Sequence, residues 1–172
     1  SGKKMENIQS DHLIKANDIS VAYQVYGNGY PLILIMGYGN TKHRWEKSLL
    51  EKLAKFFEVI IFDNRGMGNT TVGEKTFSIE QFADDVSDFM TALKIKKANI
   101  LGWSMGALIA QELVLRHEKK VNKLILYAGY CDQAMFPAEA EVYKTLTESF
   151  CTQDEKDEKK EKVLCLLFPK KW

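Results

Sequence analysis

Short apolar segments alternate with stretches of helical periodicity along most of this chain. The segment 31–36 has no polar face, which is typical of a strand covered on both sides, and 58–62 predicts a second buried strand. Further short strands are expected at 98–101 and 121–128. Strands and helices that alternate with short connections form a mostly parallel sheet with helices on both faces. The sequence therefore predicts an α/β fold.

The N-terminal part follows a different pattern. Residues 19–25 alternate between apolar and polar side chains, which is the period of a half-buried strand. Asn17 and Asp18 precede it and are typical turn residues, so that 12–16 is expected to pair with this strand. We therefore expect an antiparallel initial hairpin that leads into the parallel sheet.

Three segments have the apolar spacing of helices. The first covers residues 45–57, and the third runs from 105 to 117. The second begins at Ser78 and Gln81, which form a capping-box pattern. The second helix also carries acidic residues that we expect to face solvent, namely Asp84, Asp85 and Asp88.

Composition narrows the class of protein. The 172 residues match the length of one domain, and 45% of them are hydrophobic, which is enough for a sizeable core. Lys and Arg number 24 and Asp and Glu number 23, so the formal net charge of +1 argues against a nucleic-acid partner. Because no apolar stretch approaches the roughly 20 residues of a membrane-spanning helix, no membrane partner is expected.

The cysteines and the first residues bear on the cellular compartment. The three cysteines, an odd number, show no Cys-x-x-Cys spacing, so neither a disulfide framework nor a zinc site is expected. A cytoplasmic location is therefore expected. Residues 1–4, before Met5, lack the apolar core of a secretory signal and are expected to be a tag remnant.

The segment Gly102-Trp103-Ser104-Met105-Gly106 lies between a predicted strand and a predicted helix. It matches the pattern Gly-x-Ser-x-Gly, in which the serine occupies a sharp, strained turn. Glycines on either side avoid collisions with the neighbouring strand and helix. The turn raises the hydroxyl above the sheet edge, at a helix N-terminus whose N–H groups can stabilise an oxyanion. Ser104 is therefore the candidate nucleophile.

With this motif the chain resembles the α/β-hydrolase superfamily over nearly all of residues 12–172. Residues 35–39, Ile-Met-Gly-Tyr-Gly, match the loop after the third strand of that family. Residues 63–68, Asp-Asn-Arg-Gly-Met-Gly, resemble its Asp-x-Arg-Gly-x-Gly turn after the fourth strand. Met36 departs from the family by replacing its usual histidine. The motif around Ser104 is similar to the serine-nucleophile branch of haloperoxidase-like esterases, enol-lactonases and proline iminopeptidase-like enzymes.

The resemblance implies a hydrolase that needs no cofactor and no metal ion. It implies an oxyanion hole formed by the backbone N–H groups of Tyr38 and Met105, and a structural turn pair of Asp63 and Arg65. Because the aspartate-nucleophile relatives carry Asp at the position of Ser104, epoxide hydrolase and haloalkane dehalogenase activities are not expected. The residues expected to line the pocket are Gly37, Trp103, Met135 and Phe136.

A serine nucleophile needs a histidine base and a carboxylate, which follow it in the chain order serine, acid, histidine. After Ser104 the sequence offers only His117, and 13 residues of helix would place it roughly 20 Å away. His12 falls in the initial hairpin, and His43 is expected either at the surface or at the pocket rim. Asp132 is a candidate acid, because some relatives carry theirs at this point.

The last segment resembles the first half of the helical cap that the family inserts after its sixth strand. Family members continue with two further strands that carry the acid and the histidine, and we expect this sequence to lack these strands. We therefore expect a tag remnant at 1–4, an α/β-hydrolase core at 5–132 and the N-terminal part of a cap at 133–172, truncated within the cap.

Two functional hypotheses remain. The preferred one is a serine hydrolase that cleaves a carboxylic ester, lactone, thioester or small amide through an acyl-enzyme on Ser104. The alternative is a non-catalytic small-molecule binding protein with the same fold. Without a histidine and an acid the chain by itself is expected to be inactive. An open edge at strand 121–128 would be costly, so we expect a C-terminal fragment of the same protein, or a second copy, to pair with it.

Overall fold

The structure is a computed structural model, and it describes residues 10–129. Within these residues six strands form one sheet in the order β1-β2-β4-β3-β5-β6. The strands are β1 (His12–Ala16), β2 (Ile19–Tyr26), β3 (Tyr30–Ile35), β4 (Phe57–Phe62), β5 (Ala98–Trp103) and β6 (Val121–Tyr127). The helices are α1 (Lys47–Leu53), α2 (Ile79–Ala92) and α3 (Met105–His117), with the short 3-10 helices η1 (Lys42–Arg44) and η2 (Glu118–Lys120).

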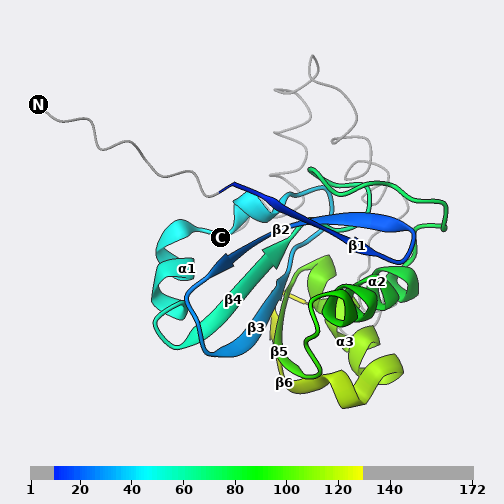
Figure 1. The fold of residues 1–172 in the computed structure, drawn as a ribbon. Helices are drawn as coiled ribbons and strands as arrows, with labels where there is room; N and C mark the ends of the chain where they lie inside the picture. The colour runs from blue at the N-terminus through cyan, green and yellow to red at the C-terminus, as the bar shows by residue number, and fades with distance from the viewer. Residues whose placement is uncertain (1–9, 130–172) are drawn as a thin grey trace, which may run out of the picture. The chain divides into compact units, whose positions relative to one another are not determined.

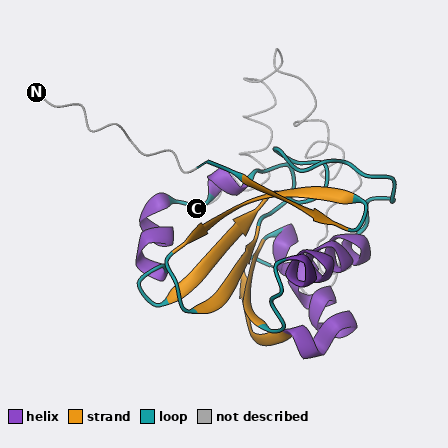
Figure 2. Cartoon of the chain, viewed as in Figure 1, coloured by secondary structure: helices purple, strands orange, loops and turns teal. Residues whose placement is uncertain are grey.

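The sheet is antiparallel at its start and parallel from there on. β2 pairs antiparallel with both β1 and β4, whereas β3 is parallel to β4 and β5, and β5 is parallel to β6. Helix α1 covers one face of the sheet, and α2 and α3 cover the other (Figures 1 and 2). The mostly parallel sheet with an initial hairpin and helices on both faces, predicted from the sequence, is confirmed.

The core consists of two apolar layers, one on each face of the sheet. In β3, Ile33 and Ile35 pack in the layer under α2 and α3. Leu32 and Leu34 alternate with them and pack in the opposite layer with Leu50 of α1. Because both faces are covered, the central strands need apolar side chains at every position. This is why the segment 31–36 has no polar face.

One predicted helix has different bounds in the structure. The segment 45–57 was expected to be helical throughout, but α1 covers only Lys47–Leu53. Trp45 ends η1, and Phe57 begins β4 opposite Tyr30 of β3. Trp45 and Phe57 still pack in the same core layer as α1, so their apolar character reflects this layer and not a helical turn.

The strand β6 is the last strand of the sheet that the structure describes. Four large apolar side chains of β6 are between 37% and 63% exposed, namely Leu124, Ile125, Leu126 and Tyr127. Their exposure fits the expectation that another segment or a second copy pairs here, which stays a prediction. Residues 10–129 contain no helix with the length and apolar character needed to cross a membrane.

The strand order places a possible binding site at one point of the sheet. From β3 the chain passes through α1 to β4 on one side, and from the adjacent β5 it passes through α3 to β6 on the other side. Where connections leave neighbouring parallel strands toward opposite faces, a crevice forms at the carboxyl ends of the strands. The residues that follow β3 and β5 therefore meet at this crevice.

Candidate active site

Ser104 lies in a strained backbone conformation directly after β5. Its φ is 56° and its ψ is −122°, and it caps the N-terminus of α3 without a capping hydrogen bond from its side chain. Positive φ is uncommon for a residue with a side chain and persists only where the surroundings impose it. Here Ser104 N donates to Tyr127 O at 3.0 Å, and Ser104 O accepts from Ala107 N at 2.9 Å. The strained turn predicted from the sequence is confirmed.

The glycines at 102 and 106 allow helix α3 to lie directly on the sheet. A Cβ atom on Gly102 would overlap Gly106 O and lie 2.7 Å from Ala107 Cα. A Cβ atom on Gly106 would overlap Ile35 O of the neighbouring strand. Because these obstacles are backbone atoms, they cannot move aside as a side chain could. The two glycines therefore bring the start of α3 against β5 and β3, as the motif predicted.

The segment 36–41, which we call the β3 loop, follows β3 and lies beside Ser104. A Cβ atom built on Gly37 would be 3.2 Å from Ser104 Cβ and 3.3 Å from Trp103 O. Within the loop, Asn40 Nδ2 donates to Tyr38 O at 2.9 Å. The loop with the predicted oxyanion donor is thus adjacent to the candidate nucleophile. The oxyanion hole of Tyr38 and Met105 itself stays a prediction.

Trp103, a predicted pocket residue, packs against a second tryptophan. Its ring lies edge-on to that of Trp45, with 6.4 Å between the ring centroids. Trp45 is buried, and its Nε1 is the one buried side-chain nitrogen or oxygen within residues 10–129 that has no hydrogen-bond partner. An unpaired buried donor of this kind costs about 1–3 kcal/mol.

Lys42, which follows the β3 loop, is fully buried, although nothing in the sequence marks it as a buried residue. Its Nζ lies 2.8 Å from Asp63 Oδ2 and 2.7 Å from Asp11 Oδ2. Burial by itself would lower the pKa of this ammonium group, but the hydrogen bonds to Asp11 and Asp63 outweigh it, and the pKa is raised above its usual 10.5. Lys42 is therefore a permanent cation at the end of the β3 loop.

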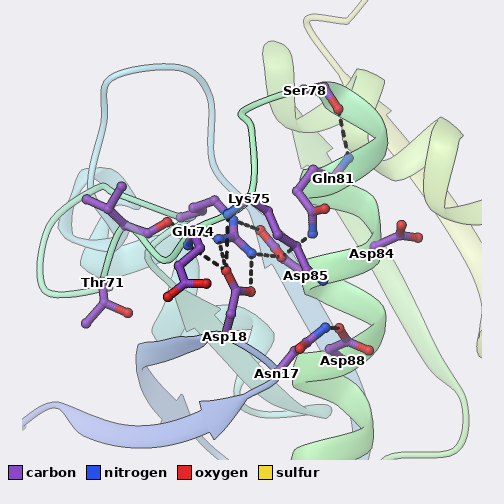
Figure 3. A network of polar contacts seen from close by, with 12 residues as sticks. Asn17, Asp18, Thr71, Glu74, Lys75, Ser78, Gln81, Asp84, Asp85 and Asp88 are labelled. Atoms are coloured by element: carbon purple, nitrogen blue, oxygen red, sulfur yellow. Dashed lines mark hydrogen bonds and ion pairs between the residues drawn. The ribbon is translucent and has the colours of Figure 1, made fainter.

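Arg65, in the turn that follows β4, forms a second buried ionic cluster. Its Nη1 and Nη2 donate to Asp18 at 2.8 Å each, and its Nε and Nη2 donate to Asp85 at 2.8 and 2.6 Å. In Figure 3, Asp18 of the β1–β2 turn lies opposite Asp85 of α2, and Gln81 of the same helix points to Asp85. The Arg65 guanidinium holds the pKa of the Asp18 carboxyl far below its usual range.

Two expectations about these charged residues are corrected. Asp63 and Arg65 do not pair with each other: Asp63 accepts from Lys42, whereas Arg65 binds Asp18 and Asp85. Asp85 does not lie on a solvated face, because it is buried against Arg65. Sequence spacing alone could not show this, because the partners are 20 or more positions apart.

The three histidines of the chain all lie within the described residues, and none is hydrogen-bonded to Ser104. His117 Nε2 lies 2.7 Å from Asp84 Oδ1 at the far end of α3. His12 packs against the ring of Tyr23, and His43 is exposed on η1. The other candidates, Asp132, Met135 and Phe136, lie outside the described residues, as does the expected cap.

Comparisons with known proteins agree with this arrangement. Residues 30–148 match the model of the family described as alpha/beta hydrolase fold. The chain is 36% identical over 131 residues to BpoC of Mycobacterium tuberculosis, provisionally named a non-heme bromoperoxidase, covering 73% of this chain and 50% of BpoC. It is 32% identical over 112 residues to the pimeloyl-[acyl-carrier protein] methyl ester esterase of Aeromonas hydrophila, covering 64% of this chain and 42% of the esterase. The chain thus spans about half the length of the curated relatives that it matches.

Solved structures give the same result. The meta-cleavage product hydrolase CumD of Pseudomonas fluorescens IP01 is 30% identical with a TM-score of 0.66, over 69% of this chain and 44% of CumD. The enol-lactonase of Burkholderia xenovorans LB400 is 29% identical with a TM-score of 0.62, over 66% of this chain and 45% of the lactonase. The chain therefore belongs to the alpha/beta hydrolase fold family, in the branch that includes haloperoxidase-like proteins and esterases.

Proposed function

We propose that the protein is a serine hydrolase that cleaves a carboxylic ester, lactone, thioester or small amide through an acyl-enzyme on Ser104. The observation that carries this proposal is the backbone of Ser104, with φ 56° and ψ −122° between β5 and α3. Strained residues of this kind cluster at active sites. Relatives named as an esterase and an enol-lactonase support the same class of reaction, attack at an acyl carbon.

The proposed reaction has two stages. Ser104 Oγ attacks the carbonyl carbon and gives its proton to a histidine base, and the carbonyl oxygen becomes an oxyanion. The backbone N–H groups of Tyr38 and Met105 donate hydrogen bonds to this oxyanion, and the N-terminus of α3 adds a favourable dipole. When the carbonyl re-forms, the leaving group departs with the proton. Water then attacks the acyl carbon and gives a proton to the base. The bond from the acyl carbon to Ser104 Oγ breaks, the base returns the proton to Oγ, and the carboxylic acid is released.

The base and the carboxylate that orients it are not found at Ser104 within residues 10–129. We assign the histidine to the part of the protein that corresponds to the remaining length of the relatives, which this chain does not span. Asp132 stays the candidate acid. No step of this mechanism uses a metal ion or an organic cofactor.

The test uses the full-length protein that contains this sequence, with p-nitrophenyl acetate as substrate and a fluorophosphonate as covalent probe. We expect the probe to modify Ser104, as located by peptide mass spectrometry. Ser104→Ala should lower turnover roughly 10³-fold or more, because the nucleophile is lost. The matched control is Ser48→Ala, a serine exposed on α1, which should keep both labelling and turnover.

Two results would contradict the proposal in different ways. Equal turnover in Ser104→Ala and in the unchanged protein would place the nucleophile elsewhere. Saturable binding of small acyl compounds, with neither turnover nor labelling of Ser104, would favour the alternative of a non-catalytic binding protein.

A further inference from the structure

The β3 loop is held at both ends by two consecutive residues of the turn after β4. At its start, Asn64 Nδ2 donates to Met36 O at 3.1 Å. Directly after its end, Asp63 Oδ1 accepts from Lys42 N at 2.7 Å. Because consecutive Cα atoms are about 3.8 Å apart, the two attachment points lie next to each other. The residues between them therefore form a loop whose two ends are fixed to one short segment of backbone.

The attachment at Asp63 is strengthened by charge. Lys42 Nζ lies 2.8 Å from Asp63 Oδ2, so the carboxylate holds both the backbone and the side chain of Lys42. Asn69 N also donates to Asp63 Oδ2 at 3.0 Å, which fixes the carboxylate from its own turn. Opening this end of the loop would separate the buried ammonium of Lys42 from the buried carboxylate of Asp63, which is unfavourable.

All the groups that make these attachments are shielded from water. Met36, Asp63 and Asn64 are 1–2% exposed, and Lys42 is fully buried. Hydrogen bonds in such surroundings are not readily exchanged for bonds to water, and a lost partner is costly. Both attachments go to backbone atoms of the β3 loop and its flank, and neither belongs to the pairing of the strands.

We propose that Asp63 and Asn64 are positioning residues for the active site, which keep the backbone N–H of Tyr38 at its working distance from Ser104. The proposal rests on the proposed function. Gly37 of the loop already lies against Ser104, and Asn40 holds the carbonyl of Tyr38, so that little freedom remains once the two ends are fixed. Asp63 and Asn64 act through the loop.

The expected size of the effect follows from the geometry that an oxyanion donor needs. A donor stabilises the transition state only when it lies about 2.7–3.1 Å from the oxyanion. A displacement of about 1 Å can cost on the order of 10²-fold in rate. Releasing one end of the loop should therefore lower kcat by roughly 10- to 100-fold. The KM should change little, because the ground-state carbonyl depends less on this donor.

The test compares two buried asparagines in the full-length protein. Asn64→Leu keeps the approximate volume of the side chain and removes the donor to Met36 O. The matched control is Asn99→Leu. Asn99 is buried near the start of β5, at the opposite end of that strand from Ser104, and its side chain accepts from Asn122 Nδ2 at 2.9 Å. Should Asn64→Leu not fold, Asn64→Ser, whose side chain is too short to reach Met36 O, replaces it.

Three measurements are made on each variant: hydrogen–deuterium exchange of the amides at 37–41, kcat and KM for p-nitrophenyl acetate, and inhibition by phenylboronic acid. The boronate forms a tetrahedral adduct on a serine and places an oxygen where the oxyanion would be. We expect Asn64→Leu to speed exchange in the loop, lower kcat at nearly constant KM and weaken boronate binding by a similar factor. Asn99→Leu should do none of these.

The outcomes separate the two levels of the proposal. Unchanged loop exchange in both Asn64 variants, or equal changes in Asn99→Leu, would overturn the role of Asn64 in holding the loop. Faster exchange with unchanged kcat, in a protein that Ser104→Ala inactivates, would show that loop position does not matter for catalysis. If Ser104→Ala keeps full turnover, the proposed function itself fails, and loop exchange still decides whether Asn64 holds the loop.

Discussion

Two buried cations, Lys42 and Arg65, are linked to the turn that follows β4, and they connect different parts of the molecule. Arg65 belongs to this turn, and Lys42 binds its residue Asp63. Arg65 joins Asp18, in the turn between β1 and β2, to Asp85 of α2. Lys42 binds Asp63 and Asp11 and directly follows the β3 loop, whose Gly37 lies beside Ser104. Residues of one short turn thus have different partners: Asp63 binds the flank of the candidate active site, and Arg65 holds the hairpin on the helix.

The chemistry of the two cations suits these different roles. The Arg65 guanidinium is planar and makes two hydrogen bonds to each of its two carboxylates, so it fixes their orientation as well as their distance. The Lys42 ammonium acts as a point charge and makes one contact to each of its carboxylates. We therefore expect Arg65 to contribute more to stability, and Lys42 to matter more for the site.

The largest effect on stability is expected for Arg65→Met. This change leaves Asp18 and Asp85 without their cation, and breaking one side of a buried ion pair costs about 3–5 kcal/mol. The free energy of unfolding, measured by urea titration, should fall by this amount. The matched control is Arg116→Met, because Arg116 makes a similar pair with Asp84 at the surface of α3, where it should contribute little. Equal losses in the two variants would remove the distinction between buried and exposed pairs.

The next prediction sharpens the difference between the two clusters. Lys42→Met should destabilise the protein less than Arg65→Met, because Asp63 keeps its hydrogen bonds from the backbone of residue 42 and from Asn69 N. Its kcat per folded molecule should nevertheless fall by up to roughly 10-fold, because the attachment of the β3 loop to Asp63 loses the ion pair that strengthens it, although the backbone hydrogen bond remains.

The comparison depends on Arg65→Met keeping its kcat when activity is corrected for the folded fraction. Steady-state kinetics of both variants at a temperature well below their unfolding midpoints provides the measurement. If Arg65→Met loses as much kcat as Lys42→Met, the two clusters are not functionally separate.

Much of the fold could be predicted from the sequence, for physical reasons that act locally. The capping box at Ser78 is a contact between near neighbours, Ser78 Oγ accepting from Gln81 N at 3.1 Å, and α2 begins where it predicts. The strain at Ser104 could be predicted because the Gly-x-Ser-x-Gly motif between a strand and a helix is typical of one sharp, strained turn. The continuous apolar segment of β3 indicates that both of its faces are buried.

The ionic clusters could not be predicted in this way. Lys42 looks like an ordinary surface lysine in the sequence, and its partners lie 21 and 31 positions away, at Asp63 and Asp11. In the sequence, nothing distinguishes Asp85 from the neighbouring aspartates Asp84 and Asp88 of α2. Only the tertiary structure brings Arg65 against Asp85. Such contacts depend on which loops meet at the sheet edge, and a single sequence carries no local signal for them.

The smallest expected effect is the contribution of each cluster to acid stability. Asp18 and Asp11 offer a fair comparison, because their side chains are equally exposed, at 18%. Hydrogen bonds from Arg65 hold the pKa of Asp18 far below its usual 3.8. Burial tends to raise the pKa of Asp11, but hydrogen bonds from Lys42 and Asn69 outweigh it, so its pKa is also lowered.

In both cases the folded protein binds the proton less readily than the unfolded chain does. The stabilising contribution is therefore complete above the usual pKa of 3.8 and is lost as the pH falls below it toward the pKa in the folded protein. The urea midpoint, followed from about pH 6 to about pH 2.5, should decline in the unchanged protein. Asp18→Asn should remove more of this decline than Asp11→Asn, because the guanidinium of Arg65 makes two hydrogen bonds to Asp18 whereas Lys42 makes one contact to Asp11. An acid profile that Asp18→Asn leaves unchanged would show that the Arg65 cluster stabilises the fold by packing and not by charge.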